Sequence, residues 1–376
     1  MQRRVVVVGS GAAGSAAALA ACKAGAHVTV VRGGVGATSL TSGALDGSLG
    51  APALSADVKG VIEALGIYTL EACTLATSAG ILRAAAGRDR GLCDLAASAG
   101  AVLVARVAHP GWDADALARS YAELDKTRDY VVRDIGLVVH PAERAMAHAE
   151  LAALHDDDTR LGLAAERIRA VLAEGSFRTV LLPPWLGVIA PRAAALSKLV
   201  GVPCGEVLTP LDGPCGARFE RARDRCFAAT AIETVPGRVK QIEARSRDDA
   251  PKYVALVEAR RIEADVVIVA TGGLLGGGLA YTPGAAATFT LTYGAAVAIG
   301  HDGHPLVVPG SVFGAPPESL VWPHEDSPLS ERVGVLTREG LRAGDDIYAA
   351  GDAVADAPRT LLAAFASGTA AGRASA

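Results

Sequence analysis

The pattern of hydrophobic and polar positions near the N-terminus predicts a strand, a helix and a second strand. A run of four valines ends at residue 8, an uncharged small-residue stretch continues to residue 22, and a second apolar run covers residues 27–31. The β-branched runs have the length of buried strands, and the alanine-rich stretch favours a helix. This order indicates a βαβ unit with parallel strands.

The rest of the chain continues to alternate between the two periodicities. Helices are predicted over residues 58–65, 70–86, 114–130, 142–155, about 161–172 and about 360–373. Strands are predicted over residues 101–107, 131–140, 178–182, 226–233, 238–244, 253–258 and 264–270. Three of these strands follow one another between residues 226 and 258, which indicates a small meander inside an α/β protein.

Three glycines mark the turn between the first strand and the helix in the pattern G-x-G-x-x-G. At such a turn the backbone can approach a pyrophosphate, and the helix N-terminus favours an anion. The uncharged stretch also looks like a lipoprotein signal peptide, but such a peptide needs neither the spaced glycines nor the second strand. We predict that the phosphates contact Gly9, Gly11, Ala12, Ala13 and Gly14.

Three further segments place small or polar residues where a nucleotide could lie. The loop over residues 33–47 is rich in glycine and hydroxyl groups, and its candidate contacts are Thr38, Ser39, Ser42 and Gly43. The strand over residues 264–270 runs into Thr271 and Gly272. Near the C-terminus, Gly351 and Asp352 precede a helix whose dipole could stabilise negative charge on a reduced flavin.

Composition excludes several classes of protein. The chain has 376 residues, of which 51% are hydrophobic and 20% charged, so the bulk of it is not disordered. A net charge of −4 gives no global basic field for nucleic acid. Six cysteines lie far apart without a C-x-x-C pair, so we expect no metal site and no iron–sulfur cluster in this chain.

Four segments in this order resemble the FAD-dependent oxidoreductases of the fumarate reductase/succinate dehydrogenase flavoprotein type. They read VVVVGSGAAG, GATSLTSGALD, IEADVVIVATGG and IYAAGD. Within that group the chain is similar to the B subunits of anaerobic glycerol-3-phosphate dehydrogenases, through residues 41–46, 181–183 with Gly187, and 216–219. The resemblance implies FAD as the cofactor, with FMN as the alternative.

The nucleotide-binding motifs stand at both ends of the chain, so a second domain is expected between them. The fold class predicted is α/β, a two-dinucleotide-binding-type Rossmann FAD domain with an inserted α/β substrate domain. The FAD domain is expected to comprise residues 1–50, 205–280 and 330–376. The inserted domain is expected to comprise residues 51–204 and 281–329.

One departure from the nucleotide-binding pattern concerns Arg32. An acidic residue usually ends the second strand and binds the adenosine ribose, but here Val31 is followed by Arg32 and two glycines. An arginine there would suit the 2′-phosphate of NADP; it could also be solvated beside an FAD held with fewer contacts. Asp352 favours FAD, because a simple NADP domain has no role for it.

A second departure is that no clear block of catalytic histidines and arginines appears. Arg218 stands at an arginine position of the resembled subunit, and its guanidinium would suit a phosphate or carboxylate of the substrate. It also belongs to a basic run typical of a solvated helix. His304, in the sequence His-Asp-Gly-His, could accept the proton of an alcohol, the alternative being a capping or solvent-facing role.

The resemblance implies a dehydrogenase subunit that oxidises a small hydroxylated or phosphorylated substrate, glycerol 3-phosphate first. Electrons would pass through a partner subunit to quinone, and the partners expected are a catalytic flavoprotein and an iron–sulfur subunit. A non-catalytic flavin-binding subunit and an NADP-dependent reductase are the alternatives. We expect a cytoplasmic protein that reaches the inner face of the membrane only through such a complex.

Overall fold

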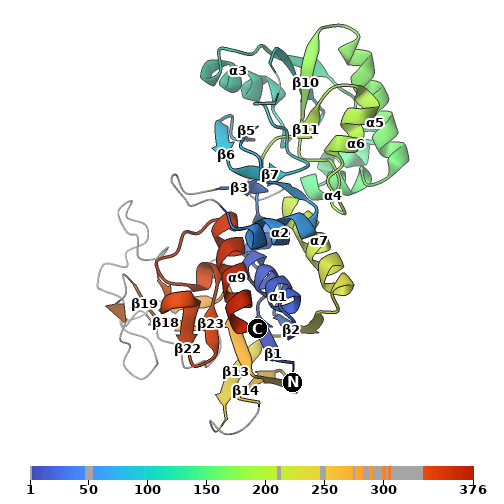
Figure 1. Ribbon diagram of the computed structural model, residues 1–376. Coiled ribbons are helices and arrows are strands. Elements are labelled where there is room, and N and C mark those ends of the chain that lie inside the picture. Colours follow the sequence, from blue (N-terminus) through green and yellow to red (C-terminus); the bar gives the residue numbers. More distant parts are fainter. Residues whose placement is uncertain are drawn as a thin grey trace. The chain divides into compact units, whose positions relative to one another are not determined.

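The computed structural model describes residues 2–46, 54–97, 99–209, 213–245, 251–273, 276–282, 288–291, 299–301, 304–305 and 333–376. The chain divides into two compact units (Figure 1). Unit 1 comprises Met1–Thr38, Ser48–Ala64 and Arg223–Ala376, and unit 2 comprises Ser39–Gly47 and Leu65–Ala222.

These bounds differ from the predicted ones in three places. Residues 205–222 belong to unit 2, although we expected the FAD domain to resume at residue 205. Residues 39–47 also belong to unit 2, whereas 51–64 belong to unit 1. Most of the predicted segment 281–329 lies outside the described residues.

A six-stranded sheet forms the centre of unit 1. Its order is β12 (Glu233–Pro236), β2 (His27–Arg32), β1 (Arg4–Val8), β16 (Val266–Val269), β23 (Ile347–Ala349) and β22 (Arg342–Gly344). The first five strands are parallel and β22 is antiparallel. In register, Val8 of β1 lies beside Val31 and Val269. Burial on both faces explains the continuous valine runs.

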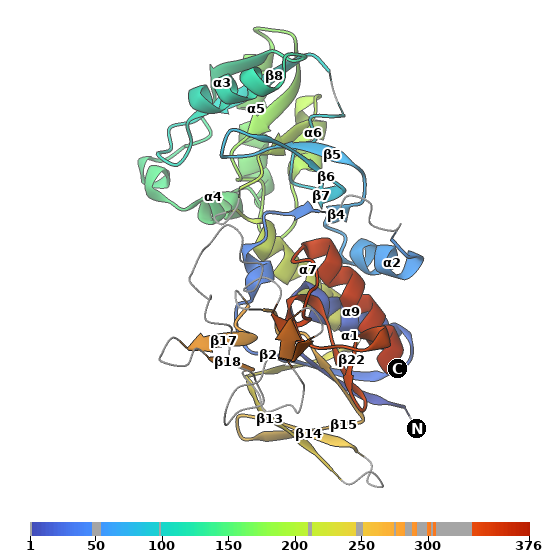
Figure 2. The ribbon, with the colours of Figure 1, turned by 90° about the vertical axis from the view of Figure 1, so that its left-hand side faces the viewer.

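Helices α1 (Ala12–Lys23) and α9 (Leu361–Ser375) lie side by side against this sheet (Figures 1 and 2). A Cβ added at Gly368 would come within 2.1 Å of the Ala13 carbonyl oxygen, and one at Gly372 within 2.3 Å of that of Ala17. The two backbones therefore touch, which only glycine permits. The small-residue composition of both helices serves this close packing.

The remaining elements of unit 1 are short. Strands β13 (Val239–Ala244), β14 (Tyr253–Val257) and β15 (Arg260–Ala264) form an antiparallel meander, seen at the bottom of Figure 2. Strand β17 (Leu279–Thr282) pairs with β18 (Thr288–Leu291), and β19 (Ile299–His301) pairs with β20 (His304–Pro305) and β21 (Gly334–Val335). Helix α2 is Ala56–Leu65.

Unit 2 contains a second parallel sheet, of order β11 (Cys204–Glu206), β10 (Phe177–Leu182), β8 (Ala101–Arg106) and β9 (Tyr130–Asp134). The connecting helices are α3 (Ala114–Leu124), α4 (His148–Leu154), α5 (Asp158–Leu172) and α6 (Ala193–Val200). Because the connection reverses direction after β9, right-handed crossovers place α3 on one face and α5 and α6 on the other, as Figure 1 shows.

Two sequence predictions of secondary structure are wrong. Residues 70–86 form no helix but a hairpin of β5 (Cys73–Ala76) and β6 (Leu82–Ala85), because Gly80 adopts a φ of +78° in a turn that no helix contains. Residues 226–229 belong to helix α7 (Cys215–Ala229) rather than to a strand. Near the hairpin, β7 (Gly87–Asp89) pairs with β3 (Ala44–Leu45) and β4 (Tyr68–Thr69).

Three other predicted elements are shorter in the structure than expected. The helix expected over 114–130 ends at Leu124, since β9 starts at Tyr130. The strand expected over 131–140 ends at Asp134. The helix expected over 142–155 is interrupted before α4, after a 3₁₀ turn at Pro141–Ala145. Among the described residues, no helix is both long and apolar enough to cross a membrane.

Candidate functional site

The predicted phosphate turn is tightly packed between β1, β16 and α1. Gly9 has a φ of +109°, and a Cβ there would lie 2.2 Å from the Ala270 carbonyl oxygen. A Cβ at Gly14 would lie 2.0 Å from the Gly9 carbonyl oxygen. Gly11 differs, because its backbone is extended and a Cβ would meet, among the described residues, only the Thr38 side chain, with Oγ1 at 3.0 Å.

The N-terminus of α1 has the properties of an anion site. No side chain caps it, and its first-turn amides, which include those of Ala13 and Gly14, make no intrahelical hydrogen bonds. The amide of Ala12 donates to Thr38 Oγ1 at 3.0 Å. Amides at an uncapped helix start favour a phosphate through both hydrogen bonds and the helix dipole. The arrangement of the turn therefore fits the pyrophosphate of a dinucleotide.

The two C-terminal motifs lie at the same edge of the sheet. Thr271 and Gly272 follow β16, and Gly351 and Asp352 follow β23, the strands next to and next but one from β1. A Cβ at Gly351, whose φ is +67°, would come within 2.6 Å of the Ala13 Cβ. The structure thus brings three separate sequence motifs together at the carboxyl ends of three neighbouring strands.

Asp352 is half-buried at this edge. Removal from water raises the pKa of its carboxyl group, and the guanidinium of Arg359 opposes that rise. Arg359 donates to the backbone carbonyls of Asp352 and Val354 rather than to the carboxylate. The carboxylate is therefore available, within the described contacts, to accept hydrogen bonds from the hydroxyl groups of a ligand.

Three predicted cofactor contacts belong to unit 2. Ser39 donates its hydroxyl to Glu220 Oε1 at 2.5 Å. Gly43 has a φ of +87°, and a Cβ there would lie 2.7 Å from the Cys215 sulfur. Ser42 precedes this strained position. Their contact with a cofactor stays a prediction.

Arg218 does not have the surroundings of a substrate clamp. It is completely buried in unit 2, where Nη1 donates to Asp89 Oδ1 at 2.8 Å and Nη2 to Glu206 Oε1 at 2.8 Å. Nε and Nη2 also donate to the carbonyls of Gly187 and Leu186, at 2.8 and 2.7 Å. With these four partners the guanidinium has no side open to a phosphate, so the geometry replaces the predicted clamp with a structural ion-pair network.

The Arg218 network also predicts a dependence of stability on pH. Burial is the largest influence on the carboxyl groups of Asp89 and Glu206 and raises both pKa values, while Arg218 opposes it. Above the ordinary carboxyl pKa, the folded state therefore binds more protons than the unfolded state, and stability falls as pH rises toward the raised pKa values.

We expect Glu206→Gln to weaken this dependence. The amide nitrogen can take the place of Oε2, which has no hydrogen-bond partner among the residues that the structure describes, while Oε1 keeps its bonds from Leu186 and Arg218. Between about pH 5 and pH 8, the free energy of unfolding should fall less in the variant than in the wild type. Urea denaturation at several pH values measures this, and equal slopes would contradict it.

His304 can be located only by its backbone. It begins β20 and stands opposite His301 in register. Its catalytic role stays a prediction. In the part of the chain that the structure describes, no three His, Cys, Asp or Glu residues are grouped so that they could hold a metal ion.

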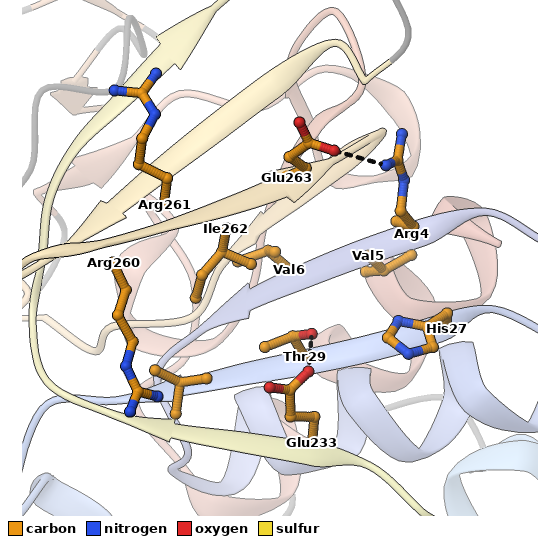
Figure 3. A pocket seen from close by; sticks show the side chains of 11 residues that line it. Arg4, Val5, Val6, His27, Thr29, Glu233, Arg260, Arg261, Ile262 and Glu263 are labelled. Carbon is orange, nitrogen blue, oxygen red and sulfur yellow. Dashed lines mark hydrogen bonds and ion pairs between the residues drawn. The ribbon is translucent and has the colours of Figure 1, made fainter.

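A pocket of about 490 Å³ opens on another part of unit 1 (Figure 3). It is lined by β1, β2, β12 and β15, with Arg4 bonded to Glu263 at 3.1 Å and Thr29 to Glu233 at 3.2 Å. None of the predicted site residues lines it. Arg4 and His27 begin their strands, whereas the glycine turn follows the carboxyl end of β1, so this pocket is not the nucleotide site.

Sequence reasoning missed Arg223 and Asp224 of α7. Arg223 is almost completely buried and donates Nη1 to the carbonyl of Ser10, inside the phosphate turn, at 3.1 Å. Asp224 accepts hydrogen bonds from Arg32. The available signal was the run of alternating arginines on this helix, which also has the composition of a solvated surface.

Residues 4–177 match the family model described as the FAD binding domain. No curated protein matches the chain. Similar solved structures include the 3-ketosteroid-delta4-(5alpha)-dehydrogenase of Rhodococcus jostii RHA1, at 15% identity and a TM-score of 0.26 over 72% of this chain and 46% of that one. The thioredoxin reductase of T. acidophilum is 12% identical, with a TM-score of 0.25, over 99% and 97%. The iminodiacetate oxidase of Chelativorans sp. BNC1 is 16% identical, with a TM-score of 0.28, over 74% and 59%.

The chain spans less than half the length of the first of these structures. Because all three TM-scores are below 0.5, the interpretation rests on the family match and the glycine turn. The fold is an α/β, Rossmann-type FAD-binding fold, the cofactor is FAD, and the match supports the class of FAD-dependent oxidoreductases.

Proposed function

We propose that this protein is a flavin-dependent dehydrogenase, or a subunit of one, that oxidises a small hydroxylated substrate. The observation that carries the proposal is the convergence of the uncapped α1 N-terminus, the glycine turns and Asp352 at one sheet edge, within a chain that matches an FAD-binding family. When bound there, FAD supplies a two-electron acceptor for a hydride. FMN would use the same turn for its single phosphate.

The residues of this chain act in binding and orientation. The first-turn amides of α1 would hold the pyrophosphate, and Asp352 would accept hydrogen bonds from ligand hydroxyls. Gly9 and Gly14 keep the strand and the helix close enough for this, since a side chain at either position would collide with backbone. The helix dipole of α1 adds favourable charge for an anion.

We propose glycerol 3-phosphate as the substrate, oxidised to dihydroxyacetone phosphate. Support comes from the resemblance through residues 41–46, 181–183 and 216–219. In this proposal the electrons pass through a partner subunit to quinone, and the expected partners are a catalytic flavoprotein and an iron–sulfur subunit. The protein is cytoplasmic and meets the membrane only through that complex. The wide spacing of the six cysteines supports placing the cluster in a partner.

Anaerobic glycerol 3-phosphate is expected to bleach the flavin of the isolated protein. Oxidation of the substrate alcohol transfers two electrons, so the flavin absorbance near 450 nm should fall by roughly one flavin per substrate oxidised. Glycerol without phosphate should bleach it far less if the phosphate contributes binding. Dithionite serves as the control that the flavin is reducible.

The second candidate is a non-catalytic flavin-binding subunit. The burial of Arg218 favours it, because this removes the anion clamp that the sequence indicated. Flavin that dithionite reduces but glycerol 3-phosphate does not, unless a co-purified partner is added, would select this candidate. An NADP-dependent reductase is disfavoured, since Arg32 is already bonded to Asp224.

A further inference from the structure

We infer that Asp224 of helix α7 supplies the carboxylate that recognises the adenosine ribose of FAD, in place of an acidic residue at the end of β2. The inference rests on the proposed flavin site of unit 1 and names the residue that makes the site select the dinucleotide. Arg32, Arg223 and the phosphate turn all belong to the same unit.

The end of β2 is where a ribose-binding acid is needed. In βαβ nucleotide sites this position lies beside the phosphate turn, and a carboxylate there accepts hydrogen bonds from ribose hydroxyls. In this chain β2 ends at Arg32, whose guanidinium has donors but no acceptor. A ribose hydroxyl that donates a hydrogen bond therefore needs an acceptor from another element.

Asp224 places a carboxylate beside the guanidinium of Arg32, the residue that ends β2. Nη1 of Arg32 lies 3.4 Å from Oδ1 and 3.3 Å from Oδ2 of Asp224. Nε of Arg223 donates to Oδ1 at 2.8 Å. The Asp224 side chain is nevertheless 50% exposed, so its oxygens keep access to a ligand as well as to these two guanidinium groups.

Arg223 connects this carboxylate to the phosphate turn. The residue is 2% exposed, and its Nη1 lies 3.1 Å from the Ser10 carbonyl oxygen and 3.4 Å from Ser10 Oγ. Ser10 stands between Gly9 and Gly11. One side chain thus bridges the turn and Asp224, in keeping with the direct linkage between pyrophosphate and ribose in FAD. Arg223 is a positioning residue, and Asp224 is the group that would touch the ligand.

The same arrangement explains why Arg32 does not indicate NADP. A 2′-phosphate approaching Arg32 would also approach the Asp224 carboxylate, and the repulsion between two anions disfavours it. A neutral ribose hydroxyl meets no such repulsion and can donate to the carboxylate. The Arg32–Asp224 pair would therefore select an unphosphorylated ribose.

The test compares the affinities of the flavin-free protein for FAD and FMN by flavin fluorescence titration. FMN has a phosphate but no adenosine ribose, so the ratio of the two dissociation constants isolates the adenosine half. Asp224→Ala is expected to weaken FAD binding about 10-fold or more, the effect of losing a hydrogen bond to a charged acceptor, with less than about a 3-fold change for FMN.

A second pair of probes addresses the hydroxyl itself. The wild type should bind ADP more tightly than 2′-deoxy-ADP or 3′-deoxy-ADP, and Asp224→Ala should remove that preference. Asp265→Ala is the matched control, because Asp265 pairs with Arg4 in the same unit but at the amino end of β1. It should leave the FAD/FMN ratio unchanged.

Three results would overturn the inference while leaving the proposed function in place. Equal losses of FAD and FMN affinity in Asp224→Ala would show a general effect on the site. An unchanged FAD affinity would show that the carboxylate does not touch the ribose. Tighter binding of 2′,5′-ADP than of ADP to the wild type would assign Arg32 to a 2′-phosphate. Failure of the wild type to bind either flavin would overturn the proposed function itself, and the inference with it.

Discussion

Replacing Arg218 with methionine is expected to destabilise unit 2 by about 3–5 kcal/mol, the typical cost of removing one partner from a buried ion pair. Methionine fills much of the space of the arginine stem, so the effect comes from charge rather than from a cavity. The carboxyl groups of Asp89 and Glu206 are both completely buried and would lose their shared counter-charge. Two backbone carbonyls would lose their donor as well.

Urea denaturation followed by tryptophan fluorescence measures this effect. Trp112 and Trp185 are both buried in unit 2 and report on it, while Trp322 lies outside the described residues. The loss should be smaller near pH 5 than near pH 8, because both carboxyl groups bind protons more readily when folded and uncompensated. A destabilisation below about 1 kcal/mol would indicate that the network is not a structural element.

A triple variant supplies the control for Arg218→Met. Adding Asp89→Asn and Glu206→Gln removes the two charges that the single variant strands. Replacing a buried ionic network with well-packed hydrophobic side chains of similar volume is often neutral or stabilising, and Asn and Gln, although polar, likewise carry no charge to strand. Recovery of a substantial part of the lost stability would show that the stranded carboxylates, and not the arginine packing, cause the loss.

The sequence predicted unit 1 well where hydrophobic runs are continuous. The valine runs of β1, β2 and β16 are buried on both faces. A continuous apolar run therefore predicts these strands without knowledge of the elements that pack against them. The hairpin at residues 73–85 was missed because its alanine-rich sequence has high helix propensity. There, the antiparallel pairing of β5 with β6 and the positive φ of Gly80 decide the structure. Backbone hydrogen bonds of Ala76 and Ser78 with Leu208, distant in the chain, hold the hairpin in place.

The sequence predicted the glycines of the candidate site, but it did not predict the contacts of the charged residues. Gly9, Gly14 and Gly351 stand where a side chain would collide with neighbouring atoms, and a local motif records this requirement. The roles of arginines on α7 depend on their contacts instead. Within one basic run, Arg218 is buried with two carboxylates, whereas Arg223 contacts the phosphate turn. Helical spacing alone could not distinguish these environments.

Gly11→Val is expected to abolish stoichiometric FAD binding while the fold persists. The backbone of Gly11 has a φ of −69° and a ψ of −170°, which valine adopts without strain. Within unit 1 its Cβ would meet only Thr38, whose side chain can rotate away. The added methyl groups would occupy the approach to the α1 N-terminus, so a pyrophosphate would lose its amide hydrogen bonds.

Loss of two such charge-assisted bonds corresponds to roughly a 100-fold or greater fall in affinity. The flavin absorbance of the purified variant and its titration with FAD measure this. Circular dichroism should show a melting temperature within about 2 °C of the wild type, since a shift of that size corresponds to about 1–2 kcal/mol for a chain of this length. Gly60→Val, in helix α2, should keep full flavin content, because outside its own helix no atom of the described residues lies within 4 Å of the added Cβ.

A substitution at Gly11 tests phosphate binding more directly than one at Gly9 or Gly14. At Gly9 or Gly14 an added Cβ would lie 2.2 or 2.0 Å from a backbone oxygen, so loss of FAD there would follow from damage to the fold. At Gly11 the effect on FAD binding can be distinguished from an effect on folding, because the added side chain fills only the side of the turn that faces the ligand. A Gly11→Val protein that retains one FAD per chain would show that the pyrophosphate does not lie on this turn, whatever the stability of the variant.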